Sequence, residues 1–187
     1  MLANKQIHFG SEVHIELIDH IWNIISTTVR TTSKELGGEK GYCKIDPEYR
    51  NAYFMCIAPN SSSAILAGTT NGLEPVYSKI WIEENKRGSY ILTAPHLTLE
   101  NYEYYKNGYE IDIYKQIDAA AAMQQHIDMG MSFNLFLEPE GLTIKTVRDI
   151  IVYAWKKKLK TLYYLRSKPP KNKEINDNKI VCVGCVN

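Results

Sequence analysis

The chain has 187 residues, of which 44% are hydrophobic and 23% charged, a composition typical of one globular domain. Its 22 Lys and Arg residues against 21 Asp and Glu residues leave a formal charge of +1, so no global field favours nucleic acid or an anionic membrane. No apolar run approaches the roughly 18 residues of a membrane span, and the N-terminus lacks the apolar core of a signal peptide. We therefore expect a cytoplasmic protein that binds neither membranes nor nucleic acid.

The first half of the chain combines one long helical pattern with short apolar runs. Apolar residues spaced by three and four predict a helix over residues 11–36, with Ser11 as its N-cap and Gly37-Gly38 at its end. Residues 53–58 form a short apolar run whose length favours a buried strand. The other features expected in this half are a polar turn and the two strands of a hairpin: 59–72, 76–82 and 89–93.

The second half predicts a crossover unit. Thr98 is placed to cap a short helix over residues 101–105, and a longer helix is expected over 111–129. A strand, a helix and a second strand then follow: 132–137, 143–157 and 160–165. Because such a crossover is right-handed and joins parallel neighbours, the fold class is α/β. The residues that follow Arg166 are too polar to bury themselves, which predicts a flexible tail.

Near its C-terminal end the sequence places Cys182 and Cys185 three residues apart, which fits a disulfide, a redox dithiol or half of a zinc site. A zinc site needs a second ligand pair, and Cys43 and Cys56 have no histidine at ligand spacing. A disulfide in a polar tail closes too short a loop to stabilise the fold. The favoured interpretation is reversible thiol chemistry on a tether of about 15 residues, whose reach is on the order of 20 Å.

Two further groups of polar residues have both structural and functional interpretations. The first, which follows Pro59, offers three hydroxyls and several backbone N–H groups that suit an anion such as phosphate: Asn60, Ser61, Ser62 and Ser63. Its local sequence alone favours a serine-rich turn with a helix cap. The second is Tyr163-Tyr164, which fits ordinary strand packing but is also a pair of oxidisable phenols. The five histidines show no metal-ligand spacing, so no metal site is expected.

Three of these signals occur in a fixed order: the serine-rich loop that runs into Thr70-Asn71-Gly72-Leu73-Glu74-Pro75, then Lys160-Thr161-Leu162-Tyr163-Tyr164-Leu165-Arg166, then the Cys-x-x-Cys. Together they resemble the C-terminal part of the large, catalytic subunit of class I ribonucleotide reductase. The resemblance covers about residues 50–187, with further matching stretches at 123–128 and 153–156. It implies that residues 1–166 form the C-terminal portion of a ten-stranded α/β barrel and that residues 167–187 form a flexible, redox-active tail.

The resemblance implies a role for each group. Asn60, Ser61, Ser62 and Ser63 would bind the phosphates of the nucleotide substrate. Tyr163 and Tyr164 would relay an oxidising equivalent from the small, metal-containing subunit that generates the radical. Cys182 and Cys185 would reduce the disulfide formed at each turnover, and thioredoxin or glutaredoxin would reduce them in turn. The chain itself would bind no cofactor directly.

The sequence also departs from the family. The family's radical cysteine lies in an Asn-x-Cys-x-Glu arrangement that does not occur here, and the N-terminal domains that bind effectors are missing. Cys43 and Cys56 match no catalytic position and are interpreted as buried or incidental. We therefore expect one piece of a split subunit, with its own Met1, that reacts only with an N-terminal partner chain. Split genes of this kind are most familiar in bacteriophages, which suggests a viral source.

Two other interpretations stay open from the sequence. A degenerate fragment would bind the small subunit or a nucleotide without chemistry, although such a fragment has no need of a tethered dithiol. An independent dithiol oxidoreductase is less favoured, because the Cys-x-x-Cys of thioredoxin-like folds opens a helix in a βαβ unit.

Overall fold

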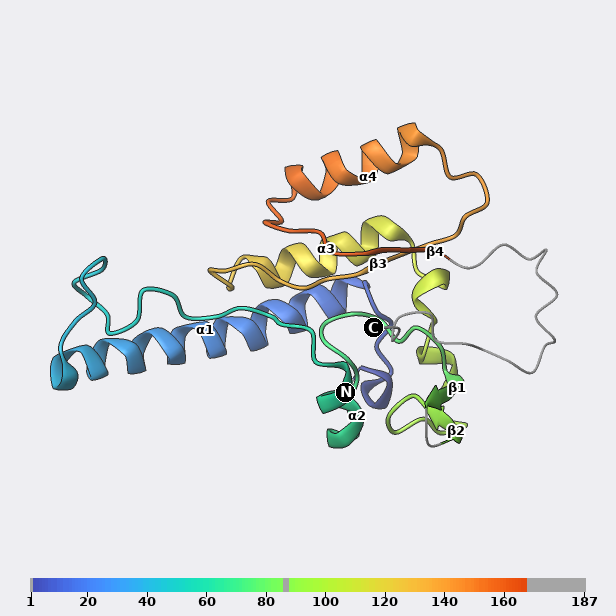
Figure 1. Ribbon diagram of the computed structural model, residues 1–187, viewed down its shortest axis with the longest axis horizontal. Helices are drawn as coiled ribbons and strands as arrows, with labels where there is room; N and C mark the ends of the chain where they lie inside the picture. The colour runs from blue at the N-terminus through green and yellow to red at the C-terminus, as the bar shows by residue number, and fades with distance from the viewer. Residues whose placement is uncertain (1, 86–87, 168–187) are drawn as a thin grey trace.

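The computed structural model describes residues 2–85 and 88–167. Its longest helix, α1 (Glu12–Lys40), extends away from a body that contains α3 (Ile113–Gln124) and α4 (Ile144–Lys156) (Figure 1). Two short strands, β3 (Leu135–Leu137) and β4 (Leu165–Ser167), pair in parallel, as the sequence predicted for this crossover. The remaining elements are short: η1 (Ala3–Lys5), α2 (Ser61–Ala67), β1 (Ile80–Asn85), β2 (Gly88–Thr93), η2 (Tyr102–Tyr104) and η3 (Gly108–Glu110).

The main hydrophobic core surrounds α3, which contacts α1, α4 and β3. The Asp112 side chain caps the helix by accepting from the N–H groups of Tyr114 and Lys115. The helix has four consecutive alanines, residues 119–122, and all four are buried. Their small side chains let neighbouring elements approach closely, and larger apolar residues fill the remaining space: Ile117, Ile127, Phe133, Leu135 and Ile150. The helix ends at Gln124, five residues earlier than the apolar pattern predicted.

Helix α1 begins as predicted, since the Ser11 hydroxyl accepts from the N–H of His14. The prediction that Gly37-Gly38 ends this helix is wrong, because α1 continues to Lys40. Gly37 serves packing instead: a Cβ at this position would lie 2.5 Å from the Tyr42 ring. The chain therefore turns back only after Lys40 and folds against the helix it has just left.

The predicted buried strand over residues 53–58 is replaced by a partly exposed extended segment with one isolated parallel bridge, Ile57 to Met131. The N–H of Ile57 donates to the Gly130 carbonyl, and the N–H of Ser132 donates to the Ile57 carbonyl. This segment lies on one side of residues 129–137, and β4 lies on the other. It is exposed because no described segment covers its outer edge.

The predicted hairpin is confirmed, with β1 and β2 pairing antiparallel from Ile80–Thr93 to Asn85–Gly88. Compared with the expected strands 76–82 and 89–93, β1 ends three residues later, at Asn85, and β2 begins one residue earlier, at Gly88. The predicted short helix after Thr98 forms as the 3-10 helix η2, and the Thr98 hydroxyl accepts from the N–H of Asn101. The strand expected over residues 132–137 contracts to β3, and the strand expected over 160–165 is shifted to β4.

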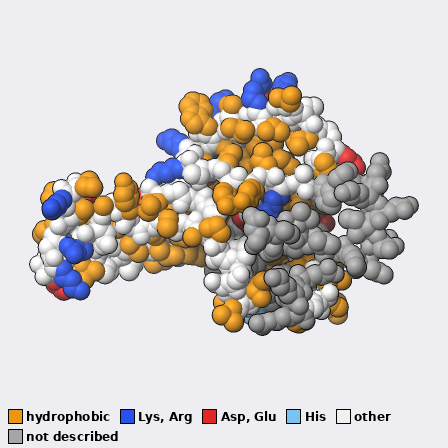
Figure 2. Space-filling view, viewed as in Figure 1, with side chains coloured by type: hydrophobic (Ala, Val, Ile, Leu, Met, Phe, Trp, Pro, Cys, Tyr) orange, Lys and Arg blue, Asp and Glu red, His pale blue; other side chains and the backbone are white. Residues whose placement is uncertain are grey.

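Large apolar side chains lie on the outer faces of α1 and α4 (Figure 2). On α4, Ile144 and Trp155 are 92% and 73% exposed. On α1, His14 and Ile18 are buried against the body, whereas Val13, Ile24 and Ile25 are exposed. Among the described residues, no helix combines the length and the apolar character that crossing a membrane requires.

Candidate functional site

The two adjacent tyrosines form a ring pair on a bulge. Tyr163 donates its N–H to the Phe133 carbonyl, at 3.1 Å, while the Tyr164 carbonyl accepts from the N–H of Leu135, at 2.9 Å. Two residues therefore lie opposite the single residue Asn134, which is the definition of a β-bulge. The rings of Tyr163 and Tyr164 lie with centroids 4.1 Å apart and planes tilted by 48°. The sequence placed the pair on the last strand, but β4 begins one residue later, at Leu165.

The tyrosine pair is open to a partner on its outer side, since Tyr163 and Tyr164 are 51% and 54% exposed. A side-chain hydrogen bond with Tyr164, together with its charge interaction, raises the pKa of Tyr163 above its ordinary value. The Tyr163 phenol therefore keeps its proton at physiological pH, and this proton must leave if the ring is oxidised.

Asn134 and Glu74 support the bulge from behind. Asn134 is 5% exposed, and its side-chain oxygen accepts from the N–H of Tyr164 at 3.3 Å. Its own N–H donates to Oε1 of Glu74 at 2.9 Å. Burial raises the pKa of Glu74, and the hydrogen bonds from Asn134 and the charge of Arg166 oppose that rise. The Glu74 carboxyl is therefore partly desolvated, and Asn134 and the charge of Arg166 compensate for part of that desolvation.

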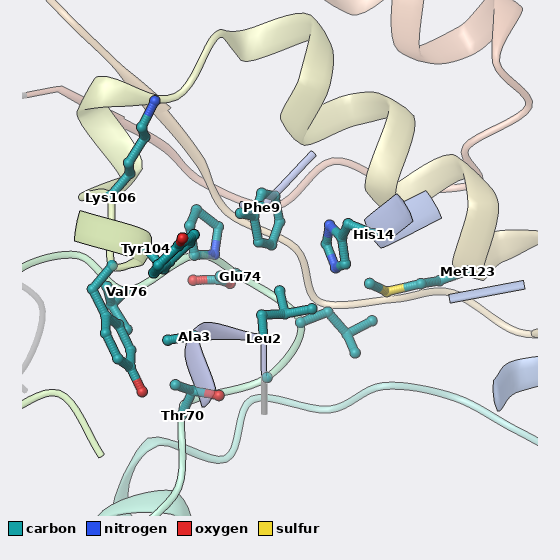
Figure 3. Close-up of a pocket in the computed structure, with 14 residues that line it drawn as sticks. Leu2, Ala3, Phe9, His14, Thr70, Glu74, Val76, Tyr104, Lys106 and Met123 are labelled. Carbon is teal, nitrogen blue, oxygen red and sulfur yellow. The ribbon is translucent and has the colours of Figure 1, made fainter. Parts of the chain in front are cut away.

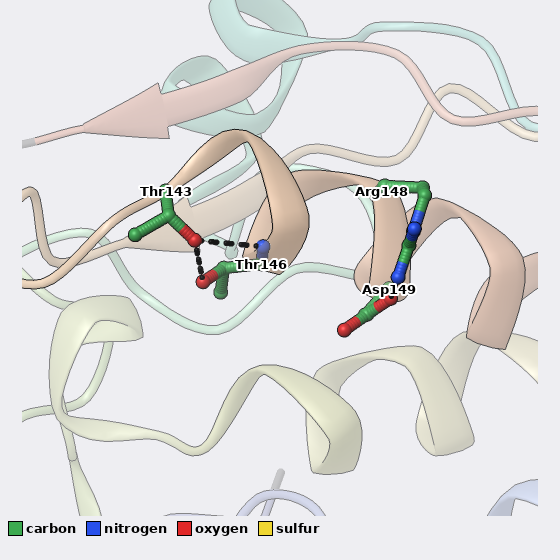
Figure 4. A network of polar contacts seen from close by, with 4 residues as sticks. All are labelled: Thr143, Thr146, Arg148 and Asp149. Carbon is green, nitrogen blue, oxygen red and sulfur yellow. Dashed lines mark hydrogen bonds and ion pairs between the residues drawn. The ribbon is translucent and has the colours of Figure 1, made fainter.

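Helix α4 fixes where the chain returns to the tyrosines. The Thr143 hydroxyl caps its N-terminus by accepting from the N–H of Thr146, and Arg148 pairs with Asp149 on its outer side (Figure 4). Near its C-terminal end, the Tyr153 hydroxyl donates to Asp118 of α3 at 2.9 Å. These contacts and the buried Ile150 and Ala154 hold α4 against α3.

The serine-rich group, expected from its local sequence as a turn with a helix cap, forms the start of helix α2. Asn60 is its N-cap residue, but its side-chain oxygen accepts from the N–H of Gly72, at 2.8 Å. Ser61 accepts from the Asn71 side chain, whereas the hydroxyls of Ser62 and Ser63 have no partner within the described part of the chain. All four side chains are exposed, and the first N–H groups of the helix have no intrahelical partner. The arrangement offers hydrogen-bond donors to a ligand from solvent.

A cavity of about 200 Å³ lies between the N-terminal segment, α1 and the residues that follow α2 (Figure 3). Its lining includes the ionisable residues His14, Glu74 and Lys106, the phenols Tyr104 and Tyr105, and apolar surface from Leu2, Phe9 and Met123. Burial lowers the pKa of His14 to about 4, so the ring is neutral at physiological pH. Glu74 therefore lines this cavity and also accepts a hydrogen bond from the N–H of Asn134.

The structure brings some predicted site residues together and leaves others apart. Tyr163 and Tyr164 form a pair, and the segment after α2 reaches Asn134 through Glu74. Cys182 and Cys185 lie outside the described residues. Cys43 and Cys56 were interpreted as buried or incidental. Burial is wrong for Cys56, which is exposed because it lies in the segment 53–58, and Cys43 is half-buried. Within the described ranges, no three His, Cys, Asp or Glu side chains gather as metal ligands.

Sequence reasoning missed Glu74 and Asn134 as members of the site. Glu74 belongs to the motif Thr70-Asn71-Gly72-Leu73-Glu74-Pro75, which by itself indicates no role for its carboxyl. Asn134 was a polar residue in the middle of the apolar run 132–137, and a polar residue at such a position needs a partner when buried. That signal was present in the sequence, but the identity of the partner was not.

Comparisons with known proteins agree with the fold. Residues 47–165 match the family described as "Ribonucleotide reductase, barrel domain". The ribonucleoside-diphosphate reductase subunit alpha of Helicobacter pylori is 36% identical over 230 residues, covering 99% of this chain and 29% of that protein. The protein of the same name from Treponema pallidum is 30% identical, covering 89% of this chain and 23% of that protein. The chain thus spans less than a third of the length of these relatives.

A solved structure also matches. The Actinobacillus ureae class Id ribonucleotide reductase alpha subunit superimposes with a TM-score of 0.71 at 23% identity, over 89% of this chain and 36% of that one. At this identity the likeness concerns the fold. The family match covers most of the described residues, including the serine-rich helix start, Glu74, Asn134 and the tyrosine pair. From its match over residues 47–165, this chain belongs to the ribonucleotide reductase barrel-domain family.

Proposed function

We propose that this chain is a component of ribonucleotide reductase, which reduces ribonucleotides to deoxyribonucleotides for DNA synthesis. In this proposal the chain supplies the substrate-phosphate loop, the tyrosine relay and the tail dithiol. The cysteine that carries the radical comes from a separate N-terminal part of the large subunit, because the sequence has no Asn-x-Cys-x-Glu arrangement. The observation that carries the proposal is the pairing of Tyr163 with Tyr164 inside the region that matches the family.

The relay role fits the geometry of the pair. Ring centroids 4.1 Å apart are close enough for an electron to pass between the rings, and the Tyr164 side chain is near enough to raise the pKa of Tyr163. The first phenol loses one electron and one proton to the oxidant of the small subunit and regains both from the second phenol. The second phenol regains them from the cysteine of the N-terminal part, which becomes the radical, so the pair ends unchanged. The exposure of both rings leaves room for the small, metal-containing subunit that supplies the oxidising equivalent.

The substrate role rests on the start of α2. Phosphate oxygens accept hydrogen bonds, and Ser61, Ser62 and Ser63 offer hydroxyl and N–H donors on an exposed surface. Asn60 supports this group indirectly, since its side chain ties the helix start to Gly72. Family membership favours the phosphates of a nucleotide substrate as the anion bound here.

The tail completes the redox balance. Replacing a ribose hydroxyl by hydrogen releases water and consumes two electrons, which leaves a disulfide in the active site. Cys182 or Cys185 attacks that disulfide as a thiolate, the other thiol resolves the mixed disulfide, and the tail becomes the oxidised pair. Thioredoxin or glutaredoxin then reduces the tail, so these proteins supply the electrons for each further turnover.

The proposal is tested by reconstitution. The chain, an N-terminal large-subunit fragment that contains the radical cysteine, and the small subunit are mixed with a nucleotide and a reductant, and deoxyribonucleotide is measured. The proposal expects product only when all three proteins are present. If the other two proteins form product equally well without the chain, or if the complete mixture forms none while the chain binds the small subunit, the chain is a non-catalytic fragment.

A further inference from the structure

We infer that Asn134 and Glu74 are positioning residues for the tyrosine pair. Asn134 closes the bulge that brings the two rings together, and Glu74 holds the Asn134 amide in the orientation that the bulge needs. The inference concerns how the rings are held, and its importance for turnover rests on the proposed function of Tyr163 and Tyr164.

The first step concerns why the rings meet at all. Successive side chains of a regular strand point to opposite faces, so neighbouring tyrosines on such a strand lie apart. The bulge breaks that alternation by placing both Tyr163 and Tyr164 opposite one residue. It also leaves the Tyr164 N–H outside the strand ladder. The Asn134 side-chain oxygen accepts from this N–H, at 3.3 Å, and so takes the place of the missing backbone carbonyl.

Glu74 sets the orientation of the Asn134 amide. An asparagine side chain carries an acceptor oxygen and a donor nitrogen, and only the oxygen can receive the Tyr164 N–H. Oε1 of Glu74 accepts from the backbone N–H of Asn134 at 2.9 Å, and the Asn134 side chain lies near enough to lower the pKa of the same carboxyl. A reversed amide would place its oxygen against this carboxylate and its NH₂ group against the Tyr164 N–H. Both contacts would be repulsive, so Glu74 selects the amide orientation that closes the bulge.

Glu74 connects the start of α2 with the tyrosine pair. Glu74 lies two residues after Gly72, whose N–H is held by the side chain of Asn60 at the start of α2. The segment that begins at Asn60 therefore ends at Glu74, which contacts Asn134 behind the tyrosine pair. The sequence motif Thr70-Asn71-Gly72-Leu73-Glu74-Pro75 thereby acquires a structural purpose, which is to fix the bulge relative to α2.

The test uses nuclear magnetic resonance on the labelled full-length chain, and it reads the ring pair directly. Two signals are measured: cross-relaxation between the rings of Tyr163 and Tyr164, and hydrogen exchange of the Tyr164 amide. The test variants are Asn134→Ala and Glu74→Ala, with Glu74→Gln as the conservative replacement that keeps an acceptor. Asn101→Ala is the matched control, because Asn101 is equally buried and hydrogen-bonded but lies in a different cluster.

The inference expects Asn134→Ala and Glu74→Ala to lose the ring cross-peaks and to exchange the Tyr164 amide about tenfold faster. Glu74→Gln and Asn101→Ala should keep the cross-peaks. If Asn134→Ala does not fold, Glu74→Ala decides alone, since Glu74 lies outside the strands. Unchanged cross-peaks in a folded alanine variant overturn the inference. A normal turnover in Tyr163→Phe would instead count against the relay and leave the positioning result untouched.

Discussion

The ring of His14 accepts a hydrogen bond at its Nδ1 atom from the N–H of Gly10, at a distance of 2.8 Å. Gly10 has a φ of +74°, and a Cβ there would lie 2.9 Å from the Cβ of Lys115 on α3. This tight turn buries His14 between the N-terminal segment and the core. The acceptor role at Nδ1 requires the neutral ring.

The first prediction concerns acid stability. Burial lowers the pKa of His14 to about 4 from an ordinary value of 6.5, so the folded state binds its proton less tightly than the unfolded state. The stabilisation is fully present above pH 6.5 and is lost as the pH falls to about 4, at a cost of about 3 kcal/mol. Urea unfolding of wild type and His14→Asn across this range measures the effect.

The Asn variant keeps a side-chain acceptor for Gly10 but cannot titrate, so its stability should vary less with pH. The control is His20→Asn, because His20 is exposed on the same helix. It should keep the wild-type pH dependence. The prediction fails if His14→Asn and wild type lose stability in parallel on acidification.

The second prediction concerns the edge segment 53–58. Asp128 accepts from the N–H groups of Phe54 and Met55, each at 2.8 Å, and these bonds lower the pKa of its carboxyl although desolvation acts in the opposite direction. Asp128→Ala should therefore lower the free energy of unfolding by roughly 1 to 3 kcal/mol and speed hydrogen exchange at Met55. Asp46→Ala, which removes an exposed cap on Glu48, should leave that exchange unchanged. Equal exchange rates at Met55 in the two variants would contradict the anchoring role.

The third prediction concerns the substrate. In the reconstituted enzyme, Ser62→Ala or Ser63→Ala should raise the KM for the nucleotide. The expected loss of binding free energy is that of one hydrogen bond to a charged group, roughly 1.5 to 3 kcal/mol. The matched control is Ser89→Ala on the exposed strand β2, which should leave KM unchanged. An unaltered KM in both test variants would remove these serines from the phosphate site.

The sequence was most informative where a local signal decides the structure. Ser11 and the apolar spacing that follows it locate the start of α1, because a cap acts within one turn, and the helix expected over 143–157 appears as α4. The parallel pairing of β3 with β4 follows from the strand–helix–strand order. The order of the serine-rich group, the tyrosine pair and the Cys-x-x-Cys indicated the family before any geometry was known.

Tertiary contacts decided the remainder. Gly37 lies inside α1 because the Tyr42 ring packs where a side chain would be, and that ring comes from beyond the helix. Residues 53–58 look like a buried strand, but burial depends on a neighbour on each side, which no single segment reveals. The bulge at Tyr163 and Tyr164 depends on the partner strand and on Glu74, which is 89 positions before Tyr163 in the chain. Local sequence contains none of this information.

The fourth prediction concerns the tail dithiol. A protein reductant needs the shuttle for repeated turnover, whereas a pre-reduced enzyme needs no shuttle for its first turnover. Cys182→Ser or Cys185→Ser should therefore leave single-turnover product nearly intact and abolish turnover driven by thioredoxin or glutaredoxin. A small diffusible dithiol should partly restore turnover, since thiol exchange requires only an accessible disulfide and a thiolate.

The matched control for the tail is Cys56→Ser, because Cys56 is an exposed thiol that has no part in the proposed cycle. It should keep full turnover with the protein reductant. Full turnover in both tail variants, or zinc bound in stoichiometric amount to the tail, would show that Cys182 and Cys185 have another role.

The most direct measurement of the central claim is the turnover of the reconstituted reductase with Tyr163→Phe and with Tyr164→Phe. Each change removes one oxidisable phenol and keeps the ring, so the fold should persist while deoxyribonucleotide formation collapses. Tyr90→Phe, an exposed tyrosine on β2, serves as the control and should retain activity. We predict loss of turnover in both relay variants, with thermal stability close to wild type. Near-normal turnover in both variants would contradict the claim that this chain carries the radical relay.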